Sequence, residues 1–170
     1  MKNIILFLWL TILMGACKEN KMSGTVINTD VNVLLVNNKG ENLIKTKLVT
    51  AQSIKVFNII DGVTKEVFDQ NSDYPRHFYI YKPVNERDHS DNDWIRVFAN
   101  IADTSPVTST IVKWNDLYAD TIKTEITRSG NSTVVTRVWL NDVLKWDVEI
   151  GKKLYNSGEI VTPRFIKIVK

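Results

Sequence analysis

The sequence predicts an all-β protein built as an antiparallel β-sandwich. Short runs rich in Val, Ile, Thr and aromatic residues recur along the chain, and Gly, Asn and Asp clusters separate them. No window of twelve or more residues keeps a sustained 3.6-residue period, so long amphipathic helices are not expected. Two-residue turn signals between neighbouring runs favour hairpins, which pair strands in the antiparallel sense.

In the first half of the chain, strands are expected wherever a β-rich run meets a turn cluster. Ile54–Ile60 alternates in polarity and ends at Asp61-Gly62. This dipeptide is typical of a type I′ hairpin, so Val63–Phe68 should be the returning strand. The other runs expected to be strands are Val31–Val36, Leu43–Val49 (the weakest of them), His77–Tyr81 and Trp94–Ala99.

The second half carries a clearer alternation. Thr121–Thr127 alternates strictly, and Asn141-Asp142 should turn the chain into a strand over Val143–Ile150. On that strand, one face should carry Leu144, Trp146, Val148 and Ile150. The remaining strands are expected over Val107–Trp114, Ser132–Leu140 and Arg164–Lys170.

Length and composition favour one ordinary globular domain. The chain has 170 residues, with 44% hydrophobic and 24% charged residues, which is enough apolar material for a core. The formal net charge is only +3, and Lys and Arg form no run of five or more. A nucleic-acid partner is therefore not expected, since it would call for a clustered basic stripe.

The first sixteen residues have the pattern of a signal peptide. Met1-Lys2-Asn3 is a short basic start, Ile4–Met14 is almost wholly apolar, and Gly15-Ala16 supplies small residues for cleavage. The apolar run is about half of the roughly 20 residues that a membrane-spanning helix needs. Residues 1–16 are therefore predicted to direct export and to be removed.

The single cysteine of the chain, Cys17, follows this segment directly. Met14-Gly15-Ala16-Cys17 resembles the lipobox of bacterial lipoproteins, although the family usually has Leu where Met14 stands. The resemblance implies that a diacylglycerol is attached to the Cys17 thiol and that the chain is cut just before it. The alternative is an ordinary signal peptide in which the cysteine is incidental.

A lipidated Cys17 would anchor the protein to a membrane, because two or three acyl chains make release negligible. Residues 17–24 are interpreted as the lipidated cysteine and a flexible tether, and residues 25–170 as the sandwich domain. Lys18 stands where lipoproteins kept at the inner membrane carry Asp, which favours the outer membrane, on its periplasmic or surface face. A seven-residue tether reaches about 23–25 Å, so a binding face should lie away from the N-terminal end of the domain.

The domain itself resembles small Bacteroidota lipoproteins with an immunoglobulin-like or transthyretin-like sandwich. The resemblance is carried by the Val33–Val36 strand with its Asn-Lys-Gly-Glu turn, by Ile111–Asp116 and by the final Phe165–Lys170 run. It implies a fold and a location in the cell envelope, and it implies no activity.

The densest acidic stretch is Glu86–Asp93. Carboxylates of Asp88, Asp91 and Asp93 are ligands of the kind that Ca²⁺ prefers, but the spacing does not match an EF-hand loop. A solvated loop at the outward end of the sandwich is the preferred interpretation, and no metal or other cofactor is expected.

Four tryptophans follow the signal segment: Trp94, Trp114, Trp139 and Trp146. Each lies in an apolar strand run, where core packing is the ordinary role of an indole. Exposed indoles would instead suit stacking on sugar rings. If one of the four is an exception to core packing, Trp114 is the first candidate, because Asn115-Asp116 places it at a strand end.

No catalytic constellation emerges from the sequence. His77 and His89 are the only histidines, a Gly-x-Ser-x-Gly nucleophile motif is absent, and the chain has too few His and Cys for a zinc site. Asp120-Thr121-Ile122 resembles a short O-glycosylation motif of Bacteroidota exported proteins, which would be blocked if Thr121 faced the core.

Together these observations predict a non-enzymatic lipoprotein of the outer membrane that acts as a binding or structural module. Its partners are expected to be the membrane, through the lipidated N-terminus, and an unidentified protein or glycan. The alternative is a carbohydrate-binding module that captures glycans, which two or more coplanar exposed Trp or Tyr rings on one face would favour.

Overall fold

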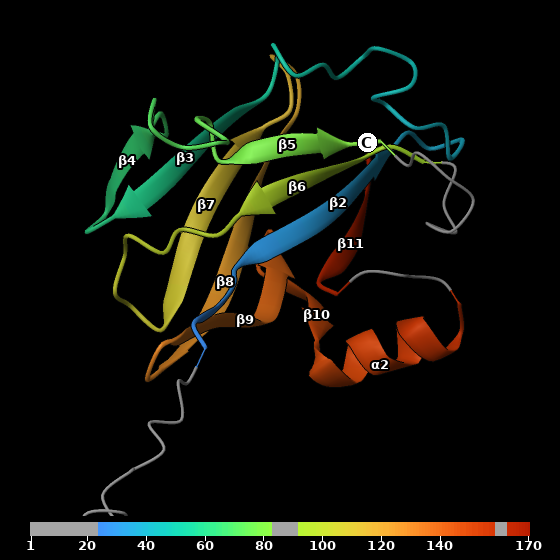
Figure 1. Cartoon of the computed structure of the whole chain (residues 1–170). Helices are drawn as coiled ribbons and strands as arrows, with labels where there is room; N and C mark the ends of the chain where they lie inside the picture. Colours follow the sequence, from blue (N-terminus) through green and yellow to red (C-terminus); the bar gives the residue numbers. More distant parts are fainter. Residues whose placement is uncertain (1–23, 83–91, 159–162) are drawn as a thin grey trace, which may run out of the picture.

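The computed structural model describes residues 24–82, 92–158 and 163–170, which form two β-sheets and one short helix (Figure 1). The prediction of an all-β sandwich is confirmed. The predicted signal peptide, Cys17 and the tether up to residue 23 lie outside the described residues. In the described ranges, no helix has the length and apolar character needed to cross a membrane.

The larger sheet has seven strands in the order β1-β9-β8-β7-β3-β4, with β10 also paired to β9. Its long central strands are joined by hairpins, so neighbours in the sequence are neighbours in space. Its strands are β1 (Val26–Asn28), β3 (Lys55–Ile60), β4 (Val63–Glu66), β7 (Val107–Lys113), β8 (Ala119–Ser129), β9 (Ser132–Leu140) and β10 (Val143–Asp147).

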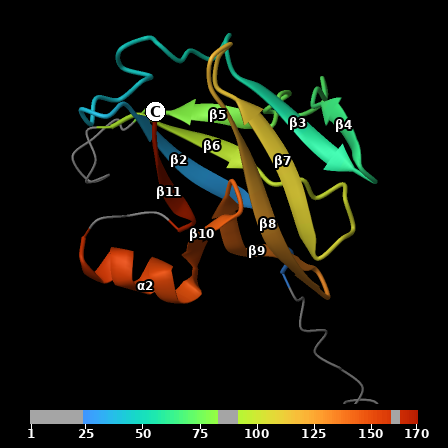
Figure 2. The same cartoon turned by 180° about the vertical axis from the view of Figure 1, so that it is seen from behind.

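The smaller sheet has four strands in the order β11-β2-β6-β5, so β5 stands at one edge. Figures 1 and 2 show this sheet packed across the larger one, with helix α2 (Val148–Asn156) beside β10 and β11. Its strands are β2 (Asp30–Val36), β5 (Phe78–Tyr81), β6 (Trp94–Phe98) and β11 (Phe165–Val169).

Two pairs of strands are parallel, so the sheets are mixed rather than wholly antiparallel: β1 pairs with β9, and β11 with β2. Both pairs join strands from distant parts of the chain, and no hairpin sets their direction. Arg164 fastens the start of β11 beside β2, because its Nε donates to the Asp30 carbonyl at 2.6 Å and its Nη2 to the Asp30 carboxylate at 2.9 Å.

The two predicted hairpins are confirmed by their backbone. Asp61 and Gly62 have φ of 51° and 77°, and Asn141 and Asp142 have φ of 48° and 69°. Positive φ at both central residues is the signature of a type I′ turn, which Asn, Asp and Gly tolerate. These turns set the registers of β3 with β4 and of β9 with β10.

The strand predicted over Leu43–Val49 is wrong, because that segment is a series of turns. The Asn42 Oδ1 accepts from the backbone N–H of Ile44 at 2.9 Å and of Lys45 at 3.2 Å, which bends the chain locally. Leu43 and Val49 still enter the core, with exposed fractions of 1% and 0%. The prediction that this run is apolar enough to enter the core is therefore right for Leu43 and Val49, whereas the predicted extended backbone is wrong.

The strand predicted over Val143–Ile150 ends early, at Asp147. The Asp147 carboxylate accepts from the backbone N–H of Ile150 at 2.8 Å and caps helix α2, and Glu149 in the first turn suits the helix dipole. The expected common face is not formed, since Val148 is 50% exposed whereas Trp146 is buried. Gly151 allows the helix to lie against Trp146, because a Cβ there would meet the indole Nε1 at 2.7 Å.

The core lies between the two sheets and is filled mainly by Val, Ile and Leu. Alternate residues of β2 and β6 face β3, β7, β8 and β9, as the period of a strand dictates. Its largest fully buried side chains are Trp114, Leu35, Leu43, Ile54, Ile95 and Ile122.

The suggestion that Trp114 is an exception to core packing is wrong, since its side chain is fully buried. Its indole Nε1 donates to the Asp120 Oδ2 at 2.7 Å. Asp120 is itself buried, with an exposed fraction of 3%. The Asp120 Oδ1 accepts from the Asn141 Nδ2 and from the Lys170 Nζ, each at 2.7 Å. The polar residues that follow Trp114 thus turn the chain toward a buried hydrogen-bond partner.

Replacing Asp120 with Ala should destabilise the fold by about 3–5 kcal/mol, because the change leaves the Lys170 charge and the Trp114 N–H without their partner. The matched control is Asp116→Ala, since Asp116 lies exposed in the loop that precedes β8. That change should alter the free energy of unfolding by no more than about 0.5 kcal/mol. Urea denaturation of both variants measures the difference, and equal losses would contradict the assignment.

Candidate functional site: a groove at the free edge of β5

Among the strands that the structure describes, β5 stands at one edge of the smaller sheet and pairs with β6 alone. Its sequence is Phe-Tyr-Ile-Tyr, with no charged residue. The edge strand β4 of the other sheet reads Val-Thr-Lys-Glu, and all four of its residues are exposed. Charged residues protect an open edge against pairing with another chain, and β5 itself has none of this protection.

The backbone groups of Phe78 and Ile80 point toward the free edge. The N–H of Phe98 donates to the His77 carbonyl at 3.0 Å, so residue 77 is paired by hydrogen bonds to β6. In an antiparallel ladder this role alternates, which directs residues 79 and 81 to β6 and residues 78 and 80 outward. Within the described ranges, the N–H and C=O groups of Phe78 and Ile80 have no hydrogen-bond partner.

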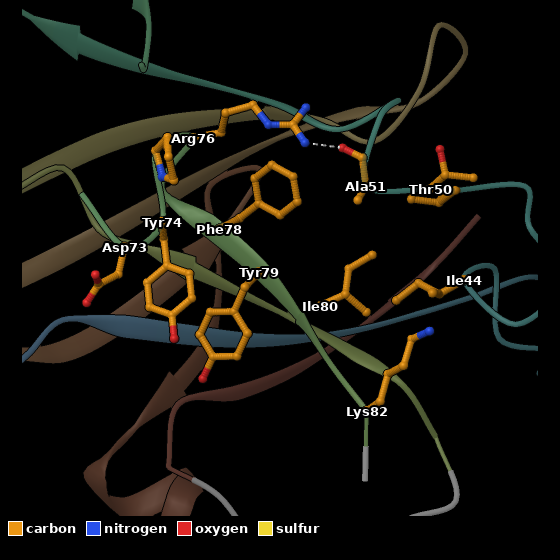
Figure 3. A pocket seen from close by; sticks show the side chains of 12 residues that line it. Ile44, Thr50, Ala51, Asp73, Tyr74, Arg76, Phe78, Tyr79, Ile80 and Lys82 are labelled. Carbon is orange, nitrogen blue, oxygen red and sulfur yellow. Dashed lines mark hydrogen bonds between the residues drawn. The ribbon is translucent and has the colours of Figure 1, made fainter. Parts of the chain in front are cut away.

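A groove of about 530 Å³ runs along this edge, between β5 and the loop that connects β2 to β3. Figure 3 shows β5 side chains on one side of the groove and those of the loop on the other. Its walls are largely apolar and include Phe78 and Ile80 from β5 together with Ile44, Val49 and Ala51 from the loop. The size is within the ordinary range for a binding pocket, about 300–1,000 Å³.

Two cations, Arg76 and Lys82, lie at different points along the groove (Figure 3). The Arg76 guanidinium donates to the carbonyls of Ala51 at 2.6 Å and Ile54 at 3.4 Å, and it lies 5.0 Å from the centre of the Phe78 ring. Among the described residues, neither cation forms an ion pair. Among the described lining residues, these two cations outnumber the single carboxylate, Asp73, so the lining carries a net positive charge.

An aromatic cluster of Tyr74, Tyr79 and Phe98 borders the groove. The rings of Tyr74 and Tyr79 stack face to face, with centroids 4.5 Å apart, and Phe98 lies 5.5 Å from Tyr74. Burial raises the pKa of the Tyr79 hydroxyl above its usual value, and the nearby Arg96 guanidinium partly offsets this effect. Because the two tyrosines cover each other, they do not form a coplanar platform for a sugar.

Three of the four tryptophans are buried, as core packing predicts. Trp94 and Trp146 are buried, with exposed fractions of 4% and 7%, and Trp139 is half-buried. Trp94 also stacks on Tyr81 at 4.4 Å between ring centroids. Trp94, Trp114 and Trp146 therefore offer no open face for sugar stacking, and the half-buried Trp139 is the one described indole with part of its surface exposed.

The remaining predicted sites are only partly covered by the structure. Most of the acidic Glu86–Asp93 stretch, with Asp88, Asp91 and His89, lies outside the described residues, so the calcium alternative stays untested. Among the residues that are described, no three His, Cys, Asp or Glu side chains gather where they could hold a metal ion. Thr121 is half-buried in β8 between buried neighbours, so it faces away from the core.

His77 lies directly before β5 and has an unusual backbone conformation, with φ of 55°. Its Nδ1 is buried without a hydrogen-bond partner. Burial lowers the pKa of the imidazole below 6.5, and the nearby Asp69 carboxylate partly offsets this shift. The side chain is therefore a neutral structural group at the start of β5.

Sequence reasoning identified the strand at His77–Tyr81 and did not identify the groove. One sequence feature points to the groove. The Phe-Tyr-Ile-Tyr run has no charged residue, whereas the Val-Thr-Lys-Glu run carries two, so only the second has the charges that protect an edge strand. The difference indicates an unprotected edge only once both runs are known to be edge strands, and the sequence alone does not show this.

Comparisons with protein-family models, with curated proteins and with solved structures find no match for this chain.

Acid should destabilise the wild-type protein through His77. Because the imidazole pKa is lower in the folded than in the unfolded chain, the unfolded chain binds more protons as the pH falls below about 6.5. The free energy of unfolding should therefore decrease as the pH is lowered from about 7.5 to 5. His77→Asn removes this titration, and Asn tolerates positive φ. Thermal melts should show a smaller acid-induced loss in the variant; an equal loss would contradict the assignment.

Proposed function

We propose that this chain is a lipid-anchored, non-enzymatic binding module of the outer membrane, which engages a protein partner through the groove beside β5. The observation that carries the proposal is the coincidence of an open strand edge with an apolar groove of binding-pocket size. Unpaired strand edges invite pairing with another chain, which proteins either prevent or use.

The groove combines apolar walls, free backbone hydrogen-bonding groups and charged side chains, all of which can contact a ligand. Its apolar walls contribute buried area, while the free N–H and C=O groups of Phe78 and Ile80 give directional hydrogen bonds. Arg76 and Lys82 add charge without competing carboxylate partners among the described residues. A few polar groups placed in a largely apolar concavity are typical of a ligand site.

The proposed location at the outer membrane is supported by Cys17, which resembles a lipobox cysteine, and by Lys18, which stands where lipoproteins kept at the inner membrane carry Asp. A lipid anchor would hold the groove at a membrane surface and raise its effective concentration toward partners on the same surface. A weak individual contact along a short strand edge would then be sufficient for function.

Removing the lipid site tests the anchor. Cys17→Ser eliminates the only thiol that a diacylglycerol can modify, so the protein should move from the membrane fraction to the soluble fraction. It should also stop incorporating labelled fatty acid. Detergent partitioning of wild type and variant measures the change, and full retention of Cys17→Ser in the detergent phase would show that the anchor is wrong.

Site-specific crosslinking in cells tests the groove. Tyr74 borders the groove and is 39% exposed, whereas Tyr155 is 68% exposed on helix α2. Each is replaced in turn by the photoreactive residue benzoylphenylalanine, which preserves an aromatic ring. A discrete adduct should form from position 74 and not from the matched control at position 155. Absence of an adduct at 74, or the same adduct from both positions, would refute binding through the groove.

A further inference from the structure

We propose that the groove takes an extended, acidic segment of the partner protein, which pairs antiparallel with β5 as a fifth strand of the smaller sheet. This inference rests on the proposed binding function and specifies the chemistry of the partner. It follows from three properties of the groove: its backbone pattern, its alternating walls and its charge.

The backbone pattern calls for an extended chain. The unpaired groups of Phe78 and Ile80 are two residues apart on a strand, a spacing of roughly 6.6–6.8 Å. Another β-strand presents N–H and C=O groups at the same interval, and an α-helix presents none, because its own hydrogen bonds occupy them. Strand addition would pair all four groups and use an edge that no charged residue of β5 protects.

The walls define which side chains the segment should carry. In an antiparallel pair, residues opposite each other have side chains on the same face of the sheet. Residues paired with Phe78 and Ile80 would therefore point toward Ile44 and Val49, on the apolar side of the groove. The residues between them would lie on the outer face beside Tyr79. The segment should thus alternate apolar and polar residues.

Charge identifies the flanking residues of the segment. Arg76 precedes β5 and Lys82 follows it, and neither has a carboxylate partner among the described residues. Asp73 also borders the groove, but Figure 3 shows its carboxylate pointing away from the other lining side chains. Carboxylates near both ends of the added strand would complement this arrangement, with each exposed ion pair contributing modestly.

The same charges disfavour a second copy of this chain as the occupant. Two β5 edges can satisfy all their free groups only if Phe78 of one copy pairs with Ile80 of the other. That antiparallel register is centred on Tyr79, so it brings position 76 of one copy opposite position 82 of the other. Arg76 would then approach Lys82, and like charges at close range oppose pairing.

A labelled peptide with the sequence Glu-Ile-Thr-Ile-Thr-Ile-Glu tests strand addition, with fluorescence anisotropy as the measure of binding. In the proposed pairing, the amides of its Ile residues face β5 and those of its Thr residues face away. N-methylation of the central Ile should therefore weaken binding about tenfold or more, because it removes a hydrogen bond and inserts a methyl group between the strands. N-methylation of a Thr should change the dissociation constant by less than about twofold.

Charge is tested with a second pair of variants. Lys82→Glu should weaken binding of the acidic peptide by about two- to fivefold, as expected for an exposed ion pair. It should also improve binding of a peptide with Lys in place of both Glu residues. Lys65→Glu, on the exposed edge strand β4, is the matched control and should change neither affinity.

The outcomes separate this inference from the proposed function. If N-methylation at Ile and at Thr has the same effect, or if the peptide does not bind, strand addition is wrong. A position-74 adduct with a partner protein would still support the groove as a binding site in that case. If the adduct instead joins two copies of this chain, the occupant is a second copy and the acidic segment is refuted.

Discussion

The hydrogen bonds that converge on the buried carboxylate of Asp120 are the interaction on which the arrangement of the two sheets depends. It accepts hydrogen bonds from Trp114 at the end of β7, from Asn141 in the β9–β10 turn and from Lys170 after β11. The first two donors belong to the larger sheet and the third follows a strand of the smaller one. Because an isolated buried charge is costly, the carboxylate is tolerated only when these donors converge on it, which requires the two sheets to be closed at this end.

The same network extends to the wall of the groove. The backbone carbonyl of Trp114 accepts from the Ser53 Oγ at 2.7 Å, and the side chain of Asn115 donates to the Leu48 carbonyl at 3.1 Å. These bonds hold the β2–β3 loop against the end of β7, while Arg76 ties it to the segment before β5. A loop without regular strands thereby becomes a fixed wall, and a fixed wall limits the entropy lost when a ligand binds.

Most strands and both hairpin turns could be predicted from short stretches of sequence alone. Alternation identified β3 and β8, since one face of each is buried, and a run of β-formers identified β9. The dipeptides Asp61-Gly62 and Asn141-Asp142 adopt the positive φ that tight hairpins need. The errors arose where a side chain competes with the ladder for backbone groups. Asn42 turns an apolar run into a loop, and Asp147 converts a strand into a helix by capping it.

The groove was beyond sequence reasoning for a different reason. Whether Phe78–Tyr81 is a central or an edge strand depends on which strands flank it, and the order β11-β2-β6-β5 brings together segments from both ends of the chain. The parallel pairing of β11 with β2 is set by contacts of Arg164 with Asp30, across 134 positions of sequence. Such long-range pairings are not joined by a local turn, so no short sequence motif predicts them.

The position of the groove is compatible with attachment at the N-terminus. In both views the described chain begins at one end of the sandwich, and β5 lies toward the opposite end (Figures 1 and 2). The open β5 edge therefore lies away from the end of the sandwich at which the described chain begins. A short tether would bring the near end close to the bilayer, while the β5 edge would stay accessible to an extended segment approaching from the aqueous side. An unprotected strand edge is less exposed to self-association when each copy is held in one orientation at a surface, so the proposed anchor would suit the open β5 edge.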